Sequence, residues 1–374
     1  MKKSSVSSVY PPKDHPSQTQ NEDRREVVFF PAVVLMTDNP YWQILKSSIE
    51  KLGVPISSDT PERFSLSWLV CRRKRVCILH FHYFQGFYKS SNGIKKFIKL
   101  VMFASNMIAA RLLGYRTVLT LHNLEGTYPV QPAWIDYLGH WIAVNFSERV
   151  IVHCKAAGDL MAGKYGRRKQ VYVVPHPSYI GWYPNQISKN EARSLINLPE
   201  NTVVFLFFGG IRPKKGIETL IRAFRILPNE NYRLLIAGKE NPDDHYLQMI
   251  QELAQGDNRI AFHTRYIQNN DVQIYLNASD ILVLPFTKVL TSGSAILALS
   301  FSRPVIVPRM GCMSELVEPG MGWFYKPEDI DSLSQAMECA VNSDFRQAGV
   351  NAFNNVNQFT PERFAEQTLR VYCE

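Results

Sequence analysis

The sequence lacks the cysteine patterns that mark zinc sites and disulfide-rich folds. No two cysteines form a Cys-x-x-Cys pair, and the six are scattered at Cys71, Cys77, Cys154, Cys312, Cys339 and Cys373. Cysteines distributed in this way indicate neither a zinc site nor a disulfide framework. We therefore expect a reducing compartment, with the cytoplasm as the default.

Long apolar runs that would export or anchor the chain are also scarce. The first 21 residues are polar, with serine and proline and no apolar core of a signal peptide, so we expect residues 1–25 to form a disordered tail. The one candidate membrane segment, residues 94–113, is interrupted by polar side chains where a span needs about 20 mostly apolar residues. We expect a helix packed on a sheet there, with an interfacial role for its basic N-terminal end as the alternative.

Acidic residues are fewer than basic ones, 33 Asp and Glu against 42 Lys and Arg. The formal net charge is +9, which favours an anionic partner such as a phosphorylated substrate, an anionic membrane surface or nucleic acid. Nucleic acid is the weakest of the three, because the lysines and arginines lie in separate loops without interleaved aromatic residues or a recognised nucleic-acid motif. We expect no nucleic-acid partner.

Apolar runs of strand length alternate with helical patterns along the whole chain. Such repeated units predict an α/β fold with doubly wound parallel sheets and right-handed crossovers. The expected strands are residues 27–36, 76–84, 118–121, 149–154 and 171–174 in the first half, and residues 203–208, 234–238, 260–262, 281–285 and 304–307 in the second.

The 374 residues are enough for two domains. The strand pattern lapses between residues 178 and 200, where Pro, Asn, Gly and Trp are frequent, and then restarts. We expect a first Rossmann-like domain over residues 26–180, a connection over 181–200 and a second Rossmann-like domain over 201–345. We expect residues 346–374 to form the C-terminal helices, and we expect these helices to cross back to the first domain.

The stretch FLFFGGIRPKKG, residues 205–216, is the most informative part of the sequence. A buried strand ends at Gly209-Gly210, the cations Arg212 and Lys215 follow, and a helical pattern begins after Gly216. Backbone N–H groups at a helix start and adjacent cations together favour phosphate binding. The alternative is a solvated loop, and the absence of Gly-x-x-x-x-Gly-Lys-Ser/Thr excludes a P-loop.

A second candidate anion site lies at residues 291–294, where Thr291, Ser292, Gly293 and Ser294 precede a helix. Hydroxyl side chains and a glycine at a helix start suit a phosphate or diphosphate, although an ordinary N-cap has the same composition. Both loops are expected at carboxyl ends of parallel strands, so we expect them to face one crevice.

His122 ends a predicted strand of the first domain and is followed by a loop. A histidine in that place can act as a base or as a hydrogen-bond donor to a sugar or phosphate, and a satisfied loop histidine is the alternative. His80 and His82 share one face of the preceding strand and lack a third ligand, so we expect both to be structural.

Several segments, in order and spacing, resemble the donor-binding half of family 4 glycosyltransferases with the GT-B fold. The similarity is strong over residues 203–341 and looser in the first half, through LTLHN, RVIVHC and VYVVPH. The segments that carry it are GGIRPKKGIETLIRAF, LLIAGK, ASDILVLPF, SFSRPVIVP and SELVEPGMGWFYKPEDIDSL.

The resemblance implies a nucleoside-diphosphate sugar as donor and a glycan or lipid-linked saccharide as acceptor, with the protein cytoplasmic or peripheral at the inner membrane face. It implies that the two candidate loops hold the donor diphosphate, that His122 acts from the acceptor side, and that no cofactor or metal is needed. The implied diphosphate residues are Arg212, Lys215, Thr291, Ser292, Gly293 and Ser294, with Gly210 and Glu315 in or near the donor pocket.

One departure from the family concerns carboxylates. Many members carry two glutamates eight positions apart, but residues 285–304 contain none, and Val289 and Leu297 stand near the corresponding positions. This resembles a subgroup of bacterial exopolysaccharide transferases. Catalysis would then depend on electrostatic stabilisation of the leaving diphosphate and on positioning of the acceptor.

Two other functions fit the same architecture. A nucleotide-sugar epimerase would act on one substrate without an acceptor. A non-catalytic module of this fold would bind glycans or lipid head groups.

Overall fold

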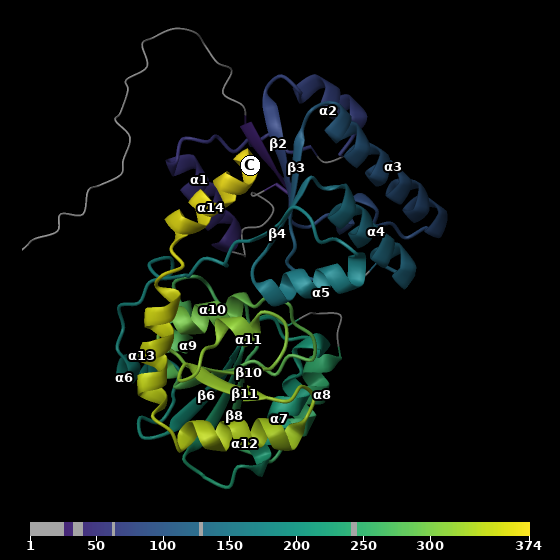
Figure 1. The fold of residues 1–374 in the computed structure, drawn as a ribbon. Helices are drawn as coiled ribbons and strands as arrows, with labels where there is room; N and C mark the ends of the chain where they lie inside the picture. Colours follow the sequence, from purple (N-terminus) through teal and green to yellow (C-terminus); the bar gives the residue numbers. More distant parts are fainter. Residues whose placement is uncertain (1–25, 33–39, 62–63, 127–129, 241–244) are drawn as a thin grey trace, which may run out of the picture.

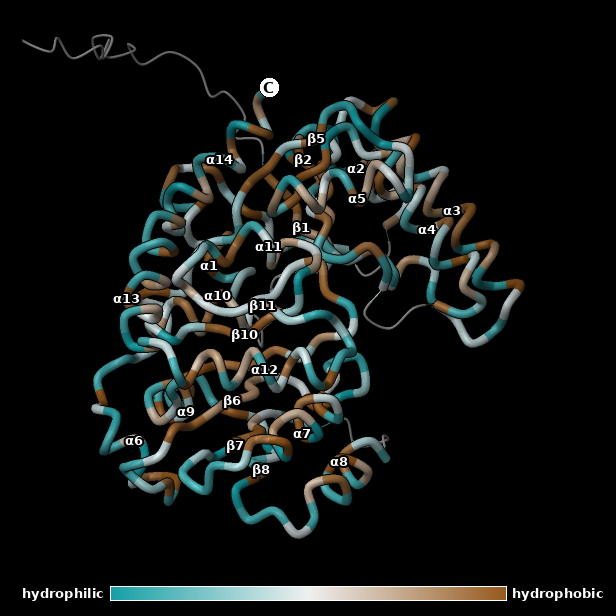
Figure 2. The backbone as a smooth tube through the Cα atoms, turned by 60° about the horizontal axis from the view of Figure 1, so that its bottom comes forward, coloured by the Kyte–Doolittle hydropathy of each residue, from teal (hydrophilic) through white to brown (hydrophobic). Residues whose placement is uncertain are grey.

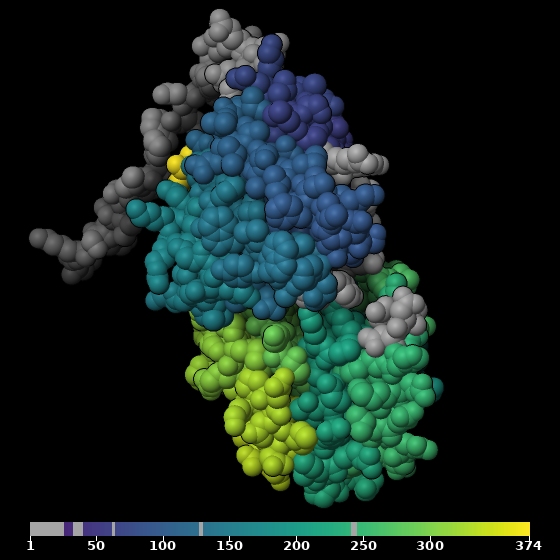
Figure 3. All heavy atoms as spheres, turned by 90° about the vertical axis from the view of Figure 1, so that its right-hand side faces the viewer, coloured from purple at the N-terminus to yellow at the C-terminus, as the bar shows by residue number. Residues whose placement is uncertain are grey.

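The computed structural model describes residues 26–32, 40–61, 64–126, 130–240 and 245–374. They form two α/β domains, one stacked on the other (Figures 1 and 3). Each domain is built on a parallel sheet, so the expected architecture is confirmed. The predicted tail, residues 1–25, lies outside the described residues, as do residues 33–36 of the first predicted strand.

The N-terminal sheet has five parallel strands in the order β1-β2-β3-β4-β5. Val28 and Phe30 pack into one hydrophobic core, and Val27 and Phe29 into another on the opposite face, as the period of two in a strand requires. The strands are β1 (Glu26–Phe30), β2 (Val76–Phe81), β3 (Arg116–Thr120), β4 (Arg149–Val152) and β5 (Val171–Val173); the helices are α1 (Pro40–Lys51), α2 (Leu66–Arg72), η2 (Gln85–Phe87), α3 (Gly93–Leu112), α4 (Ala133–Phe146) and α5 (Lys155–Tyr165).

The C-terminal sheet has six parallel strands in the order β11-β10-β9-β6-β7-β8. Strand β11, a four-residue strand that begins with glycine, was not predicted from the sequence. The strands are β6 (Val203–Phe208), β7 (Tyr232–Ala237), β8 (Ile260–His263), β9 (Ile281–Val283), β10 (Val305–Pro308) and β11 (Gly322–Tyr325); the helices are η3 (Pro213–Lys215), α7 (Ile217–Ile226), α8 (Tyr246–Ala254), α9 (Val272–Ala278), α10 (Gly293–Ser300), α11 (Met313–Leu316) and α12 (Ile330–Val341).

The chain order reverses between β6 and β9, which are neighbours in the sheet. Loops at the carboxyl ends of the strands separate at such a switch point and leave a crevice. The loop after β6 carries Arg212 and Lys215, and the loop after β9 carries Thr291. The topology therefore brings the two candidate anion loops to the same edge of the sheet.

Two helical segments connect the domains. Helix α6 (Lys189–Leu195) packs on α9, and its fully buried Arg193 donates to Asp280 Oδ2 at 2.8 Å. Helix α13 (Phe345–Val356) packs on α10 of the second domain, whereas α14 (Pro361–Cys373) packs on α1 of the first (Figure 1). Phe364 and Tyr372 of α14 are buried in the N-terminal core.

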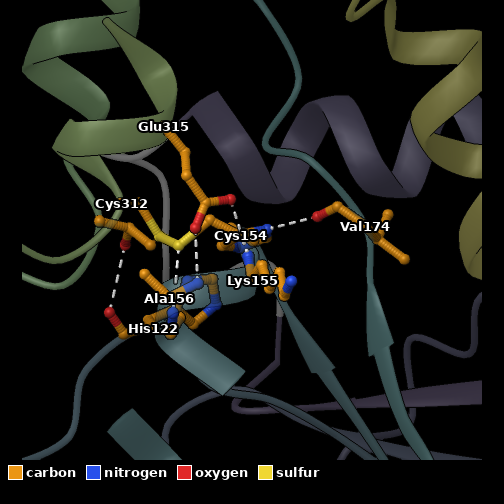
Figure 4. Close-up of a disulfide and its surroundings, with 10 residues drawn as sticks. His122, Cys154, Lys155, Ala156, Val174, Cys312 and Glu315 are labelled. Atoms are coloured by element: carbon orange, nitrogen blue, oxygen red, sulfur yellow. Dashed lines mark hydrogen bonds between the residues drawn. A yellow bond between two sulfur atoms is a disulfide. The ribbon is translucent and has the colours of Figure 1, made fainter. Parts of the chain in front are cut away.

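A disulfide between Cys154 and Cys312 joins the two domains (Figure 4). The expectation that the cysteines form no disulfide is therefore wrong. Cys154 is the N-cap of α5 and Cys312 that of α11, and the Cα atoms lie 5.6 Å apart although 158 residues separate them in sequence. Only the stacking of the domains brings them together, so spacing along the chain could not reveal the pair.

Helix α3 packs Leu100, Phe103 and Met107 inward, and Asn106 donates a hydrogen bond to the carbonyl of Phe64 at 2.6 Å. The polar interruption at Asn106 is therefore part of the packed interior. No helix within the described residues combines the length and apolar character that crossing a bilayer requires.

Candidate active site in the interdomain cleft

A cavity of about 660 Å³ lies between the two domains. It is lined by His122 from the first domain and by Arg212, Lys215, Thr291 and Gly293 from the second. The structure thus brings together five residues that the sequence analysis singled out in separate segments.

The charged residues that line the cavity are mostly cationic. Glu125 is the one carboxylate among its described lining residues, and it pairs with Lys164 at 2.7 Å. This pair lowers the pKa of Glu125. The cations that line the cavity are Lys164, Arg212, Lys214, Lys215 and Lys288. An excess of positive charge in a concave site favours an anionic ligand.

Lys215 stands at the end of η3, where backbone geometry fixes the loop. Gly216 follows with φ of 66°, and a Cβ at that position would lie 2.0 Å from the carbonyl oxygen of Pro285. Only glycine fits there, and the loop after β6 is thereby held against the loop after β9. The Lys215 side chain is in turn placed over Phe286, with Nζ 4.2 Å from the ring centroid.

The charge of Lys215 is poorly compensated. Burial, together with the nearby charge of Arg212, lowers the pKa of Lys215 to about 8. Within the described residues, Lys215 forms no ion pair with a carboxylate. A desolvated cation beside a second cation is stabilised when an anion binds.

The loop at residues 291–294 has two functions that the sequence could not separate. Ser292 is buried and its Oγ accepts from Ala295 N at 3.2 Å, so it is an N-cap of α10. Thr291 Oγ1 donates to the carbonyl of His122 at 3.1 Å and links the domains. Gly293, the first residue of α10, lines the cavity, and a Cβ there would lie 3.0 Å from Tyr179 Oη. Of the four residues, Thr291 and Gly293 reach the cavity.

Gly210, in the loop after β6, and Ser294, in the first turn of α10, are not among the residues that line the cavity. A Cβ at Gly209 would lie 3.3 Å from Ser294 Oγ, so the start of α10 faces the glycine turn after β6. The predicted contact of Ser292, Ser294 and Gly210 with a donor stays a prediction.

Glu315 is not among the residues that line the cavity, and its carboxylate lies beside the Cys154–Cys312 disulfide (Figure 4). Its carboxylate accepts from Lys155 N at 3.0 Å and from Ala156 N at 2.6 Å, at the N-terminus of α5. A carboxylate at that end of a helix is stabilised by the unpaired N–H groups. This contact joins the domains, and the donor-pocket role of Glu315 stays a prediction.

His122 lies just after β3 and is 9% exposed. Its Nε2 is 3.1 Å from His82 Nδ1. Burial and the neighbouring histidines, His153 foremost, lower the pKa of His122 well below its usual range. The ring is therefore neutral at pH 7, with one nitrogen that donates and one that accepts.

His80 and His82 differ in their surroundings. Both ring nitrogens of His80 have partners, Tyr372 Oη at 2.6 Å and Thr120 Oγ1 at 2.7 Å, as a structural histidine requires. His82 is also buried, but it contacts His122 directly.

Four further rings that line the cavity were missed by the sequence analysis: Tyr41, Tyr83, His176 and Tyr179. They come from α1 and from segments after β2 and β5, and no motif sets them apart from core aromatics. Only their convergence in space identifies them. Aromatic faces of this kind can pack against a sugar or a nucleotide base.

No cluster of three or more His, Cys, Asp or Glu side chains suited to a metal ion occurs in the part of the chain that the structure describes. The independence from metal and cofactor that the sequence suggested stays a prediction.

Comparison with known families and relatives agrees with this geometry. Residues 188–352 match the family described as Glycosyl transferases group 1. A GDP-mannose:glycolipid 4-beta-D-mannosyltransferase from Xanthomonas campestris pv. campestris is 27% identical over 314 residues, which cover 80% of each chain. The O-antigen chain mannosyltransferase B of Escherichia coli is 24% identical over 45% of each chain.

Solved structures with the same fold cover nearly the whole chain. Sucrose-phosphate synthase from Thermosynechococcus elongatus superposes with a TM-score of 0.72 at 18% identity, covering 93% of this chain and 98% of that one. Anabaena HepE in complex with UDP also gives 0.72, at 16% identity, with coverage of 93% and 99%.

Proposed function

We propose that this chain, whose residues 188–352 match the group 1 glycosyl transferases, is a member of that family, and that its interdomain cavity transfers a hexose from a nucleoside-diphosphate sugar to a glycan or lipid-linked saccharide. The observation that carries the proposal is the convergence of Arg212 and Lys215 with His122, across one cavity and from two domains.

The donor diphosphate is assigned to the cationic side of the cavity. Arg212 and Lys215 are placed to neutralise its charge, and the start of α10 at Gly293 offers backbone N–H groups. As the sugar–phosphate bond breaks, negative charge builds on the leaving diphosphate, so the same groups stabilise the transition state more than the ground state.

His122 is assigned to the transferred sugar or the acceptor, because it comes from the opposite domain. The neutral imidazole of this buried histidine positions a hydroxyl without adding a charge. Thr291 donates to the His122 carbonyl and so holds the segment after β3 next to the loop that follows β9.

GDP-mannose is the first donor to test. Both relatives described above are named as mannosyltransferases, and the Xanthomonas relative is named with GDP-mannose, whereas the solved HepE complex contains UDP. Calorimetry with GDP, UDP and their hexose conjugates would identify the base. No binding of any nucleotide by the folded protein would favour the non-catalytic module.

A labelled donor separates transfer from epimerisation. Incubation with the labelled nucleotide sugar alone should leave most of it unchanged, and addition of a lipid-linked saccharide should move label to that acceptor with release of nucleoside diphosphate. Conversion of the sugar without an acceptor would support the epimerase instead.

We further propose that the protein works at the inner face of the cytoplasmic membrane, attached through α3 and α4. Ile94, Phe97 and Met102 on α3 are 74%, 49% and 54% exposed, and Trp134 on α4 is 53% exposed. The Phe97 and Trp134 rings lie 6.3 Å apart, so the two helices form one apolar surface, which we call the α3–α4 face. Apolar residues along α3 are visible in Figure 2.

Lysines flank the α3–α4 face. Lys95, Lys96 and Lys99 lie in the first two turns of α3, which suits an anionic lipid surface. The doubly substituted variant Ile94→Asp, Phe97→Asp should lose co-sedimentation with phosphatidylglycerol vesicles. A matched control, Ile226→Asp on α7, changes a residue of similar exposure, 53%, in the other domain. If the wild type, the double variant and Ile226→Asp all sediment equally with the vesicles, the membrane proposal is wrong.

A further inference from the structure

The buried residue His82 is hydrogen-bonded to His122 and thereby affects its protonation. His82 lies directly after β2 and His122 lies two residues after β3, and these strands are parallel neighbours in which His80 pairs with Val118. Residues two apart along a strand point to the same face of the sheet. His80 therefore contacts Thr120, and His82, two residues further along the chain, contacts His122 at the cavity.

Each of the two rings carries a single proton. Burial, with the neighbouring histidines, lowers the pKa of both rings well below the usual range. The contact between His82 Nδ1 and His122 Nε2, at 3.1 Å, therefore needs the proton on one nitrogen and a lone pair on the other. The two tautomers are coupled, and the choice made at His82 fixes the choice at His122.

The surroundings of His82 favour one of the two arrangements. Its Nε2 is buried and has no hydrogen-bond partner among the described residues. The rings of Trp42, at 4.1 Å between centroids, and Phe29, at 5.4 Å, enclose His82. A proton on Nε2 would thus be an orphaned buried donor, which folded proteins avoid more strictly than an unpaired acceptor.

His153 shows that this fold tolerates a bare buried imidazole nitrogen. Its Nδ1 is 2.9 Å from the carbonyl oxygen of Val174, which can only accept, so the proton is on Nδ1. The Nε2 of His153 is then a lone pair, and it too is buried without a partner in the described part of the chain.

We propose that His82 is a positioning residue that donates from Nδ1 to His122 Nε2 and thereby holds the His122 proton on Nδ1, so that His122 faces the ligand as a hydrogen-bond donor. With Nε2 occupied by His82, Nδ1 is the ring nitrogen left for a ligand in the cavity. His122 then donates to a hydroxyl or phosphate oxygen and takes no proton from the acceptor. This inference rests on the proposed function and specifies the chemistry of its site.

The direct test reads the tautomers without turnover. Long-range ¹H–¹⁵N correlation spectra of the full chain labelled at histidine distinguish a protonated ring nitrogen from a bare one, and the single variants His82→Asn and His122→Asn identify the two signals. We expect both residues to carry the proton on Nδ1. A proton on Nε2 of His82 or His122 would overturn the proposal.

Steady-state kinetics test whether His82 contributes to turnover through His122. His82→Leu should lower kcat about tenfold, the scale of a lost orienting partner, with nucleotide affinity unchanged. His82→Asn should restore much of the rate, because its amide N–H stands near the position of Nδ1–H. The matched control is His153→Leu, at another buried histidine whose ring centroid is 5.4 Å from His122 and which is not hydrogen-bonded to it.

The outcomes separate the inference from the proposed function. A rate for His82→Leu within about threefold of wild type, or an equal loss in His153→Leu, would refute the positioning role. If His82→Leu does not fold, the tautomer spectrum of the unmodified protein decides alone. Absence of sugar transfer in a protein with the expected tautomers would refute the proposed function and leave the assignment of the protons intact.

Discussion

Nucleotide affinity should depend on pH through Lys215. Its pKa of about 8 in the free protein reflects burial and the charge of Arg212. A bound diphosphate favours the charged lysine and raises this pKa. A pKa that rises on binding means that affinity is fully present below about pH 8 and declines as the pH rises through that value.

The size of the effect follows from the protonated fraction. With a pKa of about 8, Lys215 is about nine-tenths charged at pH 7 and about one-tenth charged at pH 9, so affinity should fall about tenfold between them. The terminal phosphate of the nucleotide titrates near about pH 6 and contributes little over this range. Calorimetric titration of GDP or UDP at pH 7, 8 and 9 measures the change.

Two variants make this prediction specific. Lys215→Ala should bind about tenfold or more weakly at pH 7, the loss typical of one charge-assisted contact, and should show little further loss by pH 9. Lys326→Ala, a lysine that is 78% exposed and paired with Asp329, should behave as wild type. A flat profile in the wild type, or an unchanged decline in Lys215→Ala, would refute the role of Lys215.

Four further predictions address turnover, the cavity wall, the disulfide and the core. His122→Ala should lower kcat by about 10²-fold or more with nucleotide affinity retained, and His122→Asn should recover part of the rate if the residue acts as a donor. Gly293→Val should weaken nucleotide binding more than it lowers the melting temperature, because its branched side chain enters the cavity near Tyr179. Cys312→Ser should lose about 2 to 4 kcal/mol of unfolding free energy in denaturant without reductant, and reduction of the wild type should give the same value. Asp280→Asn should lose about 3 to 5 kcal/mol by the same measurement, because it leaves the charge of the buried Arg193 uncompensated.

Each of these predictions has a contradicting result. Turnover of His122→Ala within about threefold of wild type would remove this residue from the mechanism. Equal losses of affinity and stability in Gly293→Val would indicate a packing role. Unchanged unfolding of Cys312→Ser would show that the disulfide adds no stability, and an Asp280→Asn variant as stable as wild type would show that Arg193 finds other compensation.

The sequence allowed prediction of those features whose signal is local. Apolar runs such as residues 203–208 identified strands, and glycine with adjacent cations identified the loop that carries Lys215. Ser292 shows the limit of such patterns, because a hydroxyl before a helix fits both a phosphate site and an N-cap, and the structure shows the N-cap. Ser292→Val is therefore expected to reduce stability as well as binding.

Features that depend on packing between distant segments could not be predicted. The Cys154–Cys312 disulfide requires the stacking of two domains, and the role of His82 depends on which ring nitrogen faces His122. The sequence placed His82 on the same strand face as His80 and gave no reason to separate them. Only the hydrogen-bond partners distinguish a satisfied structural histidine from one that contacts the candidate active site.

The most direct test of the central claim is mass spectrometry of a lipid-linked saccharide after incubation with the protein and a panel of GDP- and UDP-hexoses. We predict that one donor adds a single hexose to the acceptor with release of an equal amount of nucleoside diphosphate, and that Lys215→Ala and His122→Ala both reduce the yield. Consumption of a nucleotide sugar with no mass gain on any acceptor, or equal transfer by the two variants and wild type, would contradict the assignment of the interdomain cavity as the active site.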